Sequence, residues 1–434
     1  MQVVGLESTN DPGGDMTPKI LTTLKTYDRP QFAADLFAGI TVAMVALPLS
    51  LAIAIASGAE PAQGLVTAIV AGFMISALGG SRVQIGGPTG AFIVVVFGVI
   101  AEHGYDGMVL ATFMAGLILI TAGVFRVGNL IAYVPEAVVN GFTIGIAVII
   151  ATSQFKDLLG LQGEMPAEFL GKIDAIWANR AGIVPQSLAA GLLTGGLIVL
   201  LRRLFPRWPG LIVAVAVGSA SVAFLHLPVD TIATRFGALP SRLPVPALPA
   251  LSWDRVTELL PSAFVIAFLA GVESLLSAMV ADRMIGGRHR PGAEVIAQGA
   301  ANLSSALFGG LPATGAIART ATNVRAGGRT PVAGIVHALT LLALMMVAAP
   351  VAGYLAMPAM AALLILTAWN MAEPHKWPAY MRAPMPDRLL LLLTLVLTVL
   401  TDLTVAIGVG VALGLAIRLR RRNVDPADWD TPDR

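Results

Sequence analysis

Long apolar runs are the feature that most constrains the fold of this chain. Twelve of them have about the length that a helix needs to cross a bilayer, and few polar residues separate them. The runs lie near residues 36–57, 64–80, 107–125, 128–153, 184–201, 209–226, 261–281, 291–308, 331–349, 351–370, 386–401 and 403–419. We therefore predict an all-α polytopic membrane protein.

The composition of the chain agrees with this prediction. Hydrophobic residues make up 56% of the 434 residues and charged residues only 12%, whereas about 25% of a soluble domain is charged. The net charge of +2 is too small to indicate nucleic acid as a partner. The chain has no Cys, which excludes disulfides, thiolate metal sites and thiol nucleophiles.

Two further apolar segments, 91–101 and 316–326, are too short to cross alone. A helix of that length covers roughly 16 Å, about half the hydrocarbon thickness. Gly, Pro and small residues precede both segments: G-G-P-T-G at 86–90 and L-P-A-T-G at 311–315. Non-helical backbone at this depth is tolerated where protein buries it or where it lines a cavity. We expect each extended stretch to lead into a half-helix, which gives fourteen segments, seven in each half.

The distribution of Lys and Arg predicts the orientation of the chain. With fourteen segments and an inner N-terminus, these residues gather on the inner side, whereas the short outer loops near 58–63, 102–106 and 309–315 contain none. This is the bias that the positive-inside rule describes. We predict a multi-pass protein of the plasma membrane, the inner membrane of a bacterium, with both termini in the cytoplasm.

An odd number of segments per half would place the second half upside down relative to the first. Interrupted segments at matching positions of two such halves indicate the binding site of a transporter. The predicted parts are a cytoplasmic arm (1–35), a first repeat of segments 1–7 (36–226), a linker (227–260), a second repeat of segments 8–14 (261–420) and a short cytoplasmic tail (421–434).

The two half-helices, the third and tenth segments, would point their N-termini at each other near the membrane midplane. Each N-terminus offers unpaired N–H groups and about half a positive charge, so together they can bind an anion. Thr89 and Thr314 add hydroxyls, and Gly90 and Gly315 let a ligand approach the backbone. The alternative is that the Gly and Pro residues only mark tight turns.

Four residues within the predicted segments complete the candidate site. Arg319 lies one turn into the second half-helix and has three candidate roles. It attracts the substrate, it pairs with a carboxylate, or, as the structural alternative, it extends to the inner surface. Glu273 is the only charge in its span and is a candidate proton carrier, cation ligand or counter-ion of Arg319, with a structural ion pair as the alternative. Ser277 lies on the same helical face as Glu273, and Ser50 follows a proline in the first span and is free to line the cavity.

The sequence is similar to the sulfate permease (SulP) family of anion transporters, which includes the solute carrier sulfate/chloride exchangers and prestin. The matching stretches are G-G-P-T-G-A-F at 86–92, A-G-V-E-S-L-L-S-A at 270–278 and L-P-A-T-G-A-I-A-R-T-A-T-N-V-R-A-G-G-R-T at 311–330. The resemblance runs from about 30 to 422. It implies a seven-plus-seven inverted repeat with core and gate subdomains, a homodimer, and anion transport where the third and tenth segments meet.

The resemblance also implies roles for individual residues. Carried over by position, it places the anion against Thr89, Gly315 and Ala316. Glu273 and Ser277 occupy positions that help to form a sodium site in the bicarbonate carriers of the family.

The chain departs from the family pattern in two ways. Sodium–bicarbonate members have Asp in place of Glu273 and lack Arg319, which matches an Arg near the anion in chloride-handling members. This combination favours a proton over sodium as the coupling ion. Most members continue into a cytoplasmic STAS domain, whereas only polar residues 423–434 follow here, so a short member and a removed domain both remain open.

We therefore predict a secondary active transporter that carries a small anion inward with a proton by alternating access. A dicarboxylate such as fumarate or succinate is the first candidate and sulfate the second. The alternatives are sodium-coupled bicarbonate symport, proton-coupled nucleobase uptake on the same repeat, and an uncoupled anion exchanger or channel. No set of catalytic residues and no metal-ligand spacing is visible, so we expect no enzyme activity, no metal and no cofactor.

Overall fold

The computed structural model describes residues 16–126, 135–163, 165–205, 209–401 and 403–420. It is mostly helical, which confirms the all-α prediction. The helices of the first part are α1 (Lys19–Thr23), α2 (Arg29–Ala56), α3 (Pro61–Leu78), α4 (Phe92–Val124), α6 (Glu136–Leu159), α7 (Phe169–Ala178), α8 (Pro185–Leu204), α9 (Gly210–Phe224) and α10 (Ile232–Phe236). Those of the second part are α11 (Trp253–Ile285), α12 (Pro291–Leu307), α13 (Ile317–Arg325), α14 (Pro331–Ala352), α15 (Met357–Met371), α16 (Trp377–Arg382), α17 (Met385–Leu400) and α18 (Leu403–Arg420).

Every predicted apolar run overlaps one of these helices. Among the described residues, seven helices are long and apolar enough to span a membrane: α2, α3, α4, α6, α8, α11 and α14. The count of fourteen segments and their inverted repeat stay predictions. Four boundaries differ by six residues or more. The helix α2 begins at Arg29, within the expected arm, and α6 extends to Leu159 rather than 153. The helix α11 begins at Trp253, within the expected linker, and α15 begins at Met357 rather than 351. The start of the run at 128 lies outside the described residues.

The first half-helix is set off from the next span by a single residue. Gly104 has φ 71° and ψ 178°, which breaks the helical path of α4 in the middle. We expected an ordinary loop at 102–106. Instead, the chain is helical on both sides of Gly104, and this one residue makes the break. Its combination of φ and ψ is accessible almost only to glycine. The second half-helix is α13, which has nine residues and follows a non-helical stretch, as predicted.

The two extended stretches that precede the half-helices pair with each other. β1 (Gly86–Gly87) and β2 (Thr314–Gly315) run antiparallel, with Gly86 opposite Gly315 and Gly87 opposite Thr314. The polypeptide enters α4 a few residues after β1 and enters α13 two residues after Gly315. The N-termini of the two half-helices therefore start from one place, as the sequence predicts.

Side chains from neighbouring helices satisfy the backbone groups of these stretches. The amide of Asn302 in α12 receives a hydrogen bond from Ala313 N and donates one to Ala313 O, both at 2.9 Å. Asn323 Nδ2 in α13 donates to Val83 O at 2.8 Å. A buried backbone group without a partner would cost roughly 1–3 kcal/mol, so these amides stabilise a non-helical segment inside a helical protein.

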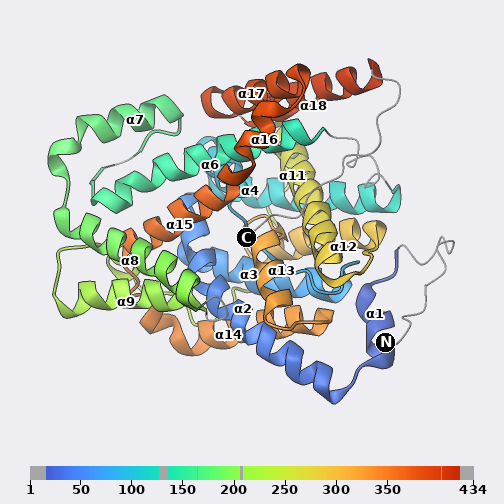
Figure 1. Ribbon diagram of the computed structural model, residues 1–434, viewed down its shortest axis with the longest axis horizontal. Helices are drawn as coiled ribbons and strands as arrows, with labels where there is room; N and C mark the ends of the chain where they lie inside the picture. The colour runs from blue at the N-terminus through green and yellow to red at the C-terminus, as the bar shows by residue number, and fades with distance from the viewer. Residues whose placement is uncertain (1–15, 127–134, 164, 206–208, 402, 421–434) are drawn as a thin grey trace.

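The helices form two groups that pack mainly within themselves. One contains α2, α3, α4, α11, α12, α13 and α14, and the other contains α6, α8, α9, α15, α17 and α18. In Figure 1 the early helices α2 and α3 lie beside α13 and α14, far away in sequence, and α14 packs against both α2 and α3. The paired strands lie within the first group.

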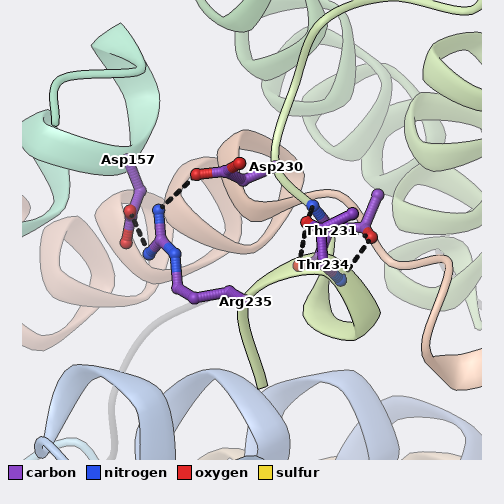
Figure 2. A network of polar contacts seen from close by, with 5 residues as sticks. All are labelled: Asp157, Asp230, Thr231, Thr234 and Arg235. Atoms are coloured by element: carbon purple, nitrogen blue, oxygen red, sulfur yellow. Dashed lines mark hydrogen bonds and ion pairs between the residues drawn. The ribbon is translucent and has the colours of Figure 1, made fainter. Parts of the chain in front are cut away.

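The connection between α9 and α11 is fixed to the second group by polar contacts. Figure 2 shows Arg235 of α10 between two carboxylates: Nη1 lies 2.6 Å from Asp157 Oδ1 and Nη2 lies 3.1 Å from Asp230 Oδ2. The backbone N–H of Ile232 also donates to Leu355 O at 2.9 Å. The expected linker is therefore partly ordered and attached to α6 and to the start of α15.

We predict that Gly104→Ala lowers the free energy of unfolding by about 1–3 kcal/mol. The reason is that the backbone of Ala is strained at φ 71°. Nothing lies within 4 Å of the added Cβ, so the effect comes from the backbone alone. Gly196→Ala in α8 adds a methyl group to equally open space within a helix and should keep or raise the melting temperature. Thermal unfolding in detergent measures both, and equal melting temperatures for the two variants would contradict the strained break.

Candidate functional site

The N-terminus of α13 carries three backbone donors without partners among the described residues. The first hydrogen bond of this helix runs from Thr320 N to Ala316 O at 2.9 Å. The N–H groups of Ile317, Ala318 and Arg319 precede it and donate to no described atom. Ile317 is half-buried and Ala318 is exposed. Solvent or a ligand can therefore reach this positive helix end.

The start of α4 offers two more such donors. The N–H groups of Phe92 and Ile93 form a tight turn with Thr89 O at 3.2 Å and Gly90 O at 3.0 Å. Those of Gly90 and Ala91 have no partner in the part of the chain that the structure describes. A side chain at position 90 would press on the sulfur of a methionine in α15, which explains the glycine. The two half-helix starts together present five unpaired donors.

Glu273 reaches this site from α11. Its Oε2 accepts a hydrogen bond of 2.9 Å from Thr89 Oγ1, and both side chains are half-buried. No Lys, Arg or His among the described residues forms an ion pair with Glu273. The predicted roles of counter-ion to Arg319 and of structural ion pair are therefore wrong for this conformation, whereas proton carrier and cation ligand remain.

Arg319 lies behind the extended stretch and does not extend to a surface. It is only 1% exposed. Nη2 donates to Ser50 Oγ at 3.2 Å and to Pro88 O at 2.9 Å, and Nη1 lies 3.5 Å from Gly86 O. Gly87 has φ 146°, and a Cβ there would overlap Nη1 of the guanidinium. The buried charge thus holds the bend before α4 and adds positive potential behind both half-helix starts.

The polar groups of three residues expected to contact the anion take part in the frame of the site, and their contact with an anion stays a prediction. Thr314 Oγ1 donates to Ala270 O at 2.8 Å, and the N–H of Ala316 donates to Ile85 O at 2.8 Å. Gly315 is buried within the strand pair. The free donors of this arm therefore lie just beyond Ala316, within the first turn of α13.

The two predicted serines are also buried in the frame. Ser50 is fully buried and accepts the hydrogen bond from Arg319, so it does not line a cavity as expected. Ser277 lies 3.3 Å from Thr320 Oγ1 of α13 and has no bond to Glu273. Their roles as direct ligands stay predictions that this conformation does not support.

Sequence reasoning missed a buried polar chain beside the strand pair. Gln84 Nε2 donates to Ser274 Oγ at 3.1 Å, and Ser274 Oγ donates to Glu294 Oε1 at 2.6 Å. The N–H of Gly80 donates to Glu294 Oε2 at 3.0 Å. Glu294 is a charge within a predicted span, which is the signal that identified Glu273. This chain of hydrogen bonds links the segment between α3 and β1 to α11 and α12.

No group of three or more His, Cys, Asp and Glu side chains that could hold a metal occurs in the described ranges. The site is instead a set of backbone donors, one hydroxyl and one carboxylate, with a guanidinium behind them. Such a set suits a small anion, with the Glu273 carboxyl beside it as a group that can exchange a proton.

Comparison with protein families also indicates a transporter of small anions. The Sulfate permease family matches residues 32–394. The chain belongs to the sulfate permease family. The family consists of membrane transporters, which confirms that this multi-pass membrane protein is not an enzyme.

Two relatives show how far the similarity reaches. The putative sulfate transporter YvdB of Bacillus subtilis is 42% identical over 378 residues, covering 85% of this chain and 70% of YvdB. The bicarbonate transporter BicA of Picosynechococcus is 32% identical over 325 residues, covering 73% of this chain and 57% of BicA. The chain therefore spans little more than half the length of that BicA.

Solved structures confirm the fold. The transmembrane domain of a cyanobacterial bicarbonate transporter BicA superposes with a TM-score of 0.78 at 28% identity, covering 90% of this chain and 98% of that one. SLC26A9 superposes with a TM-score of 0.85, covering 94% of this chain and 68% of that one. Its 19% identity supports the fold alone.

The packing of Gln84 against Gly315 gives a test of the strand pair. A Cβ at position 315 would overlap the Gln84 amide, so Gly315→Ala should lower the melting temperature. The double variant G315A/Q84A should lose less stability than the two single variants together, with an interaction energy of about 0.5–3 kcal/mol. Thermal unfolding of the four proteins measures this, and strictly additive losses would contradict the contact.

Proposed function

We propose that this protein is a secondary active transporter that moves a small anion together with a proton by alternating access. The observation that carries the proposal is the set of unpaired N–H groups at the start of α13, beside the start of α4. The anion binds between Thr89 and the first turn of α13. Glu273, which shares a hydrogen bond with Thr89, carries the proton.

The chemistry of the donors favours a small oxyanion. Backbone N–H groups at two helix ends bind sulfate and carboxylate oxygens without a charged side chain in contact. The sequence alone put a dicarboxylate such as fumarate first and sulfate second. The name of the Bacillus relative supports sulfate, so we now place sulfate first.

Proton coupling follows from the surroundings of Glu273. A carboxylate in an apolar helix is costly when charged unless a cation or several donors compensate it. Only Thr89 donates to it among the described residues, and Arg319 bonds elsewhere. A proton that neutralises Glu273 removes a negative charge from beside the anion, so proton and anion bind more favourably together.

The wider arrangement belongs to the same proposal. Both termini lie in the cytoplasm, the membrane is the plasma membrane, and the protein is a homodimer. Residues 36–226 and 261–420 form inverted repeats that the linker 227–260 connects. The two groups of helices act as core and gate, with the site on the core group.

The second candidate is sodium-coupled bicarbonate symport. The similarity to BicA in sequence and fold favours it. Glu273 bonds to Thr89 and Ser277 lies beside Thr320, so the two side chains do not face one shared sodium site in this conformation. Replacing sodium with choline during uptake distinguishes the two, because proton symport continues in choline. An uncoupled exchanger or channel would respond to neither gradient.

Glu273→Gln should remove the dependence of uptake on the proton gradient, because an amide cannot release a proton. In proteoliposomes with wild-type protein, an inward proton gradient should raise sulfate uptake several-fold, and in E273Q the same gradient should leave uptake unchanged. Glu258→Gln on the same helix is the matched control. Its carboxylate is exposed and lies 3.3 Å from His103, so coupling should be intact. Full coupling in E273Q would exclude Glu273 as the proton carrier.

Ile317→Pro should weaken anion binding by removing one backbone donor. Proline suits the first position of a helix, and the preceding Ala316 already has the extended conformation that proline requires. Loss of a hydrogen bond to a charged ligand costs about 1.5–3 kcal/mol, so KM for the anion should rise about 10- to 150-fold.

Ile317→Ala is the control for this substitution, since it shortens the side chain and keeps the N–H. Its KM should stay within about threefold of the wild-type value. Equal KM values for I317P and I317A, with both proteins folded, would show that this N–H does not bind the anion.

A further inference from the structure

Lys172 is a buried cation without an acidic partner among the described residues. It belongs to α7, between α6 and α8, and is 5% exposed. Its Nζ lies 5.0 Å from the centroid of the Phe97 ring, and no hydrogen bond or ion pair to Nζ occurs among the described residues. Burial lowers the pKa of Lys172. A cation–π contact supplies only part of the electrostatic stabilisation that a carboxylate would give to the ammonium. The ammonium therefore remains available to an anion.

Lys172 bridges the two groups of helices. α7 packs against α6 and α17, whereas Phe97 lies on the first half of α4. Phe97 is five residues beyond the start of that half-helix, which is about 7.5 Å along its axis. The ammonium thus lies on the side of the anion site towards Gly104, where the half-helix ends. We call this side the Gly104 end.

Open space adjoins the contact. The next residue along α4, Gly98, is half-buried, and no atom lies within 4 Å of the position of its Cβ. Because successive helix residues point about 100° apart, this open space lies on the face of α4 next to the face of Phe97. A larger residue at position 98 would reduce this space.

Several exposed carboxylates lie around the Gly104 end, together with the exposed cation Arg180. Exposed carboxylates flank the end of α2, the break in α4 and Lys172 itself: Glu60, Glu102, Asp106, Glu168 and Asp174. An anion that approaches from this end meets repulsion at the rim. A positive charge buried behind the rim offsets that repulsion on the way to the half-helix starts.

We propose that Lys172 is a second anion contact on the path between the Gly104 end and the site at the half-helix starts. This inference rests on the proposed function. The Phe97 ring holds the ammonium while no anion is present, and an arriving oxyanion replaces the ring as its partner. An ammonium is a compact charge without the planar fork of Arg, so Lys172 serves capture of small anions rather than selection among them.

The test compares uptake from the two sides of the membrane, in vesicles of both orientations. The probe is whichever of sulfate, bicarbonate and fumarate the unmodified protein takes up. For Lys172→Met, KM measured from the Gly104 end should rise about tenfold or more, and KM from the other end should stay within about twofold. Arg180→Met is the matched control, because Arg180 is an exposed cation of the same connection, and its KM should not change.

The absence of natural Cys allows a second arm of the test. Lys172→Cys can be labelled with membrane-impermeant thiol reagents. A cationic reagent should bring KM from the Gly104 end back to within about threefold of the wild type, and an anionic reagent should not. Lys172→Arg should behave as the cationic adduct does.

The outcomes separate the two proposals. If the unmodified protein takes up none of the three anions, the proposed function is wrong and this inference falls with it. If it takes one up and K172M keeps the wild-type KM from both ends, the inference alone is wrong. An equal rise in KM from both ends, or equal recovery with both thiol reagents, would assign Lys172 a structural role and overturn the inference.

Discussion

The two-residue antiparallel pair between Gly86–Gly87 and Thr314–Gly315 is the interaction on which the rest of the structure depends. Non-helical backbone inside a membrane protein must find partners, because lipid supplies none. Here two stretches far apart in sequence supply them to each other, and Asn302, Asn323 and Arg319 satisfy the carbonyls that remain. Because a half-helix follows each strand, the pair also fixes where both positive helix ends start.

This arrangement separates the charge that holds the extended stretch, Arg319, from the proposed proton carrier, Glu273. The Nη atoms of Arg319 contact backbone carbonyls and Ser50, and its charge adds positive potential near both half-helix starts. Glu273 approaches from α11, and within the described ranges only Thr89 donates a hydrogen bond to it. In the proposed mechanism the donors at the start of α13 bind the anion. A change in the protonation of Glu273 would then act on the anion directly, without breaking an ion pair of the protein.

Much of this was visible in the sequence. The two T-G-A stretches before short apolar segments predicted the half-helices, and they brought Thr89, Glu273 and Arg319 into one region. The direction of each hydrogen bond was not visible, so Thr314, Gly315 and Ala316 were taken for ligands although their polar groups hold the frame. The early start of α11 was missed because Trp253–Glu258 is amphipathic rather than apolar. Lys172 was missed because a charge in a connection between spans gives no signal of burial.

The most direct test of the central claim is an experimental structure of the protein with selenate, a heavy analogue of sulfate, located by its anomalous scattering. The account predicts a selenium peak between the first turn of α13 and Thr89, with selenate oxygens within hydrogen-bond distance of the N–H groups of residues 317–319. A fully occupied selenate elsewhere, with this position empty in the same crystal, would contradict it.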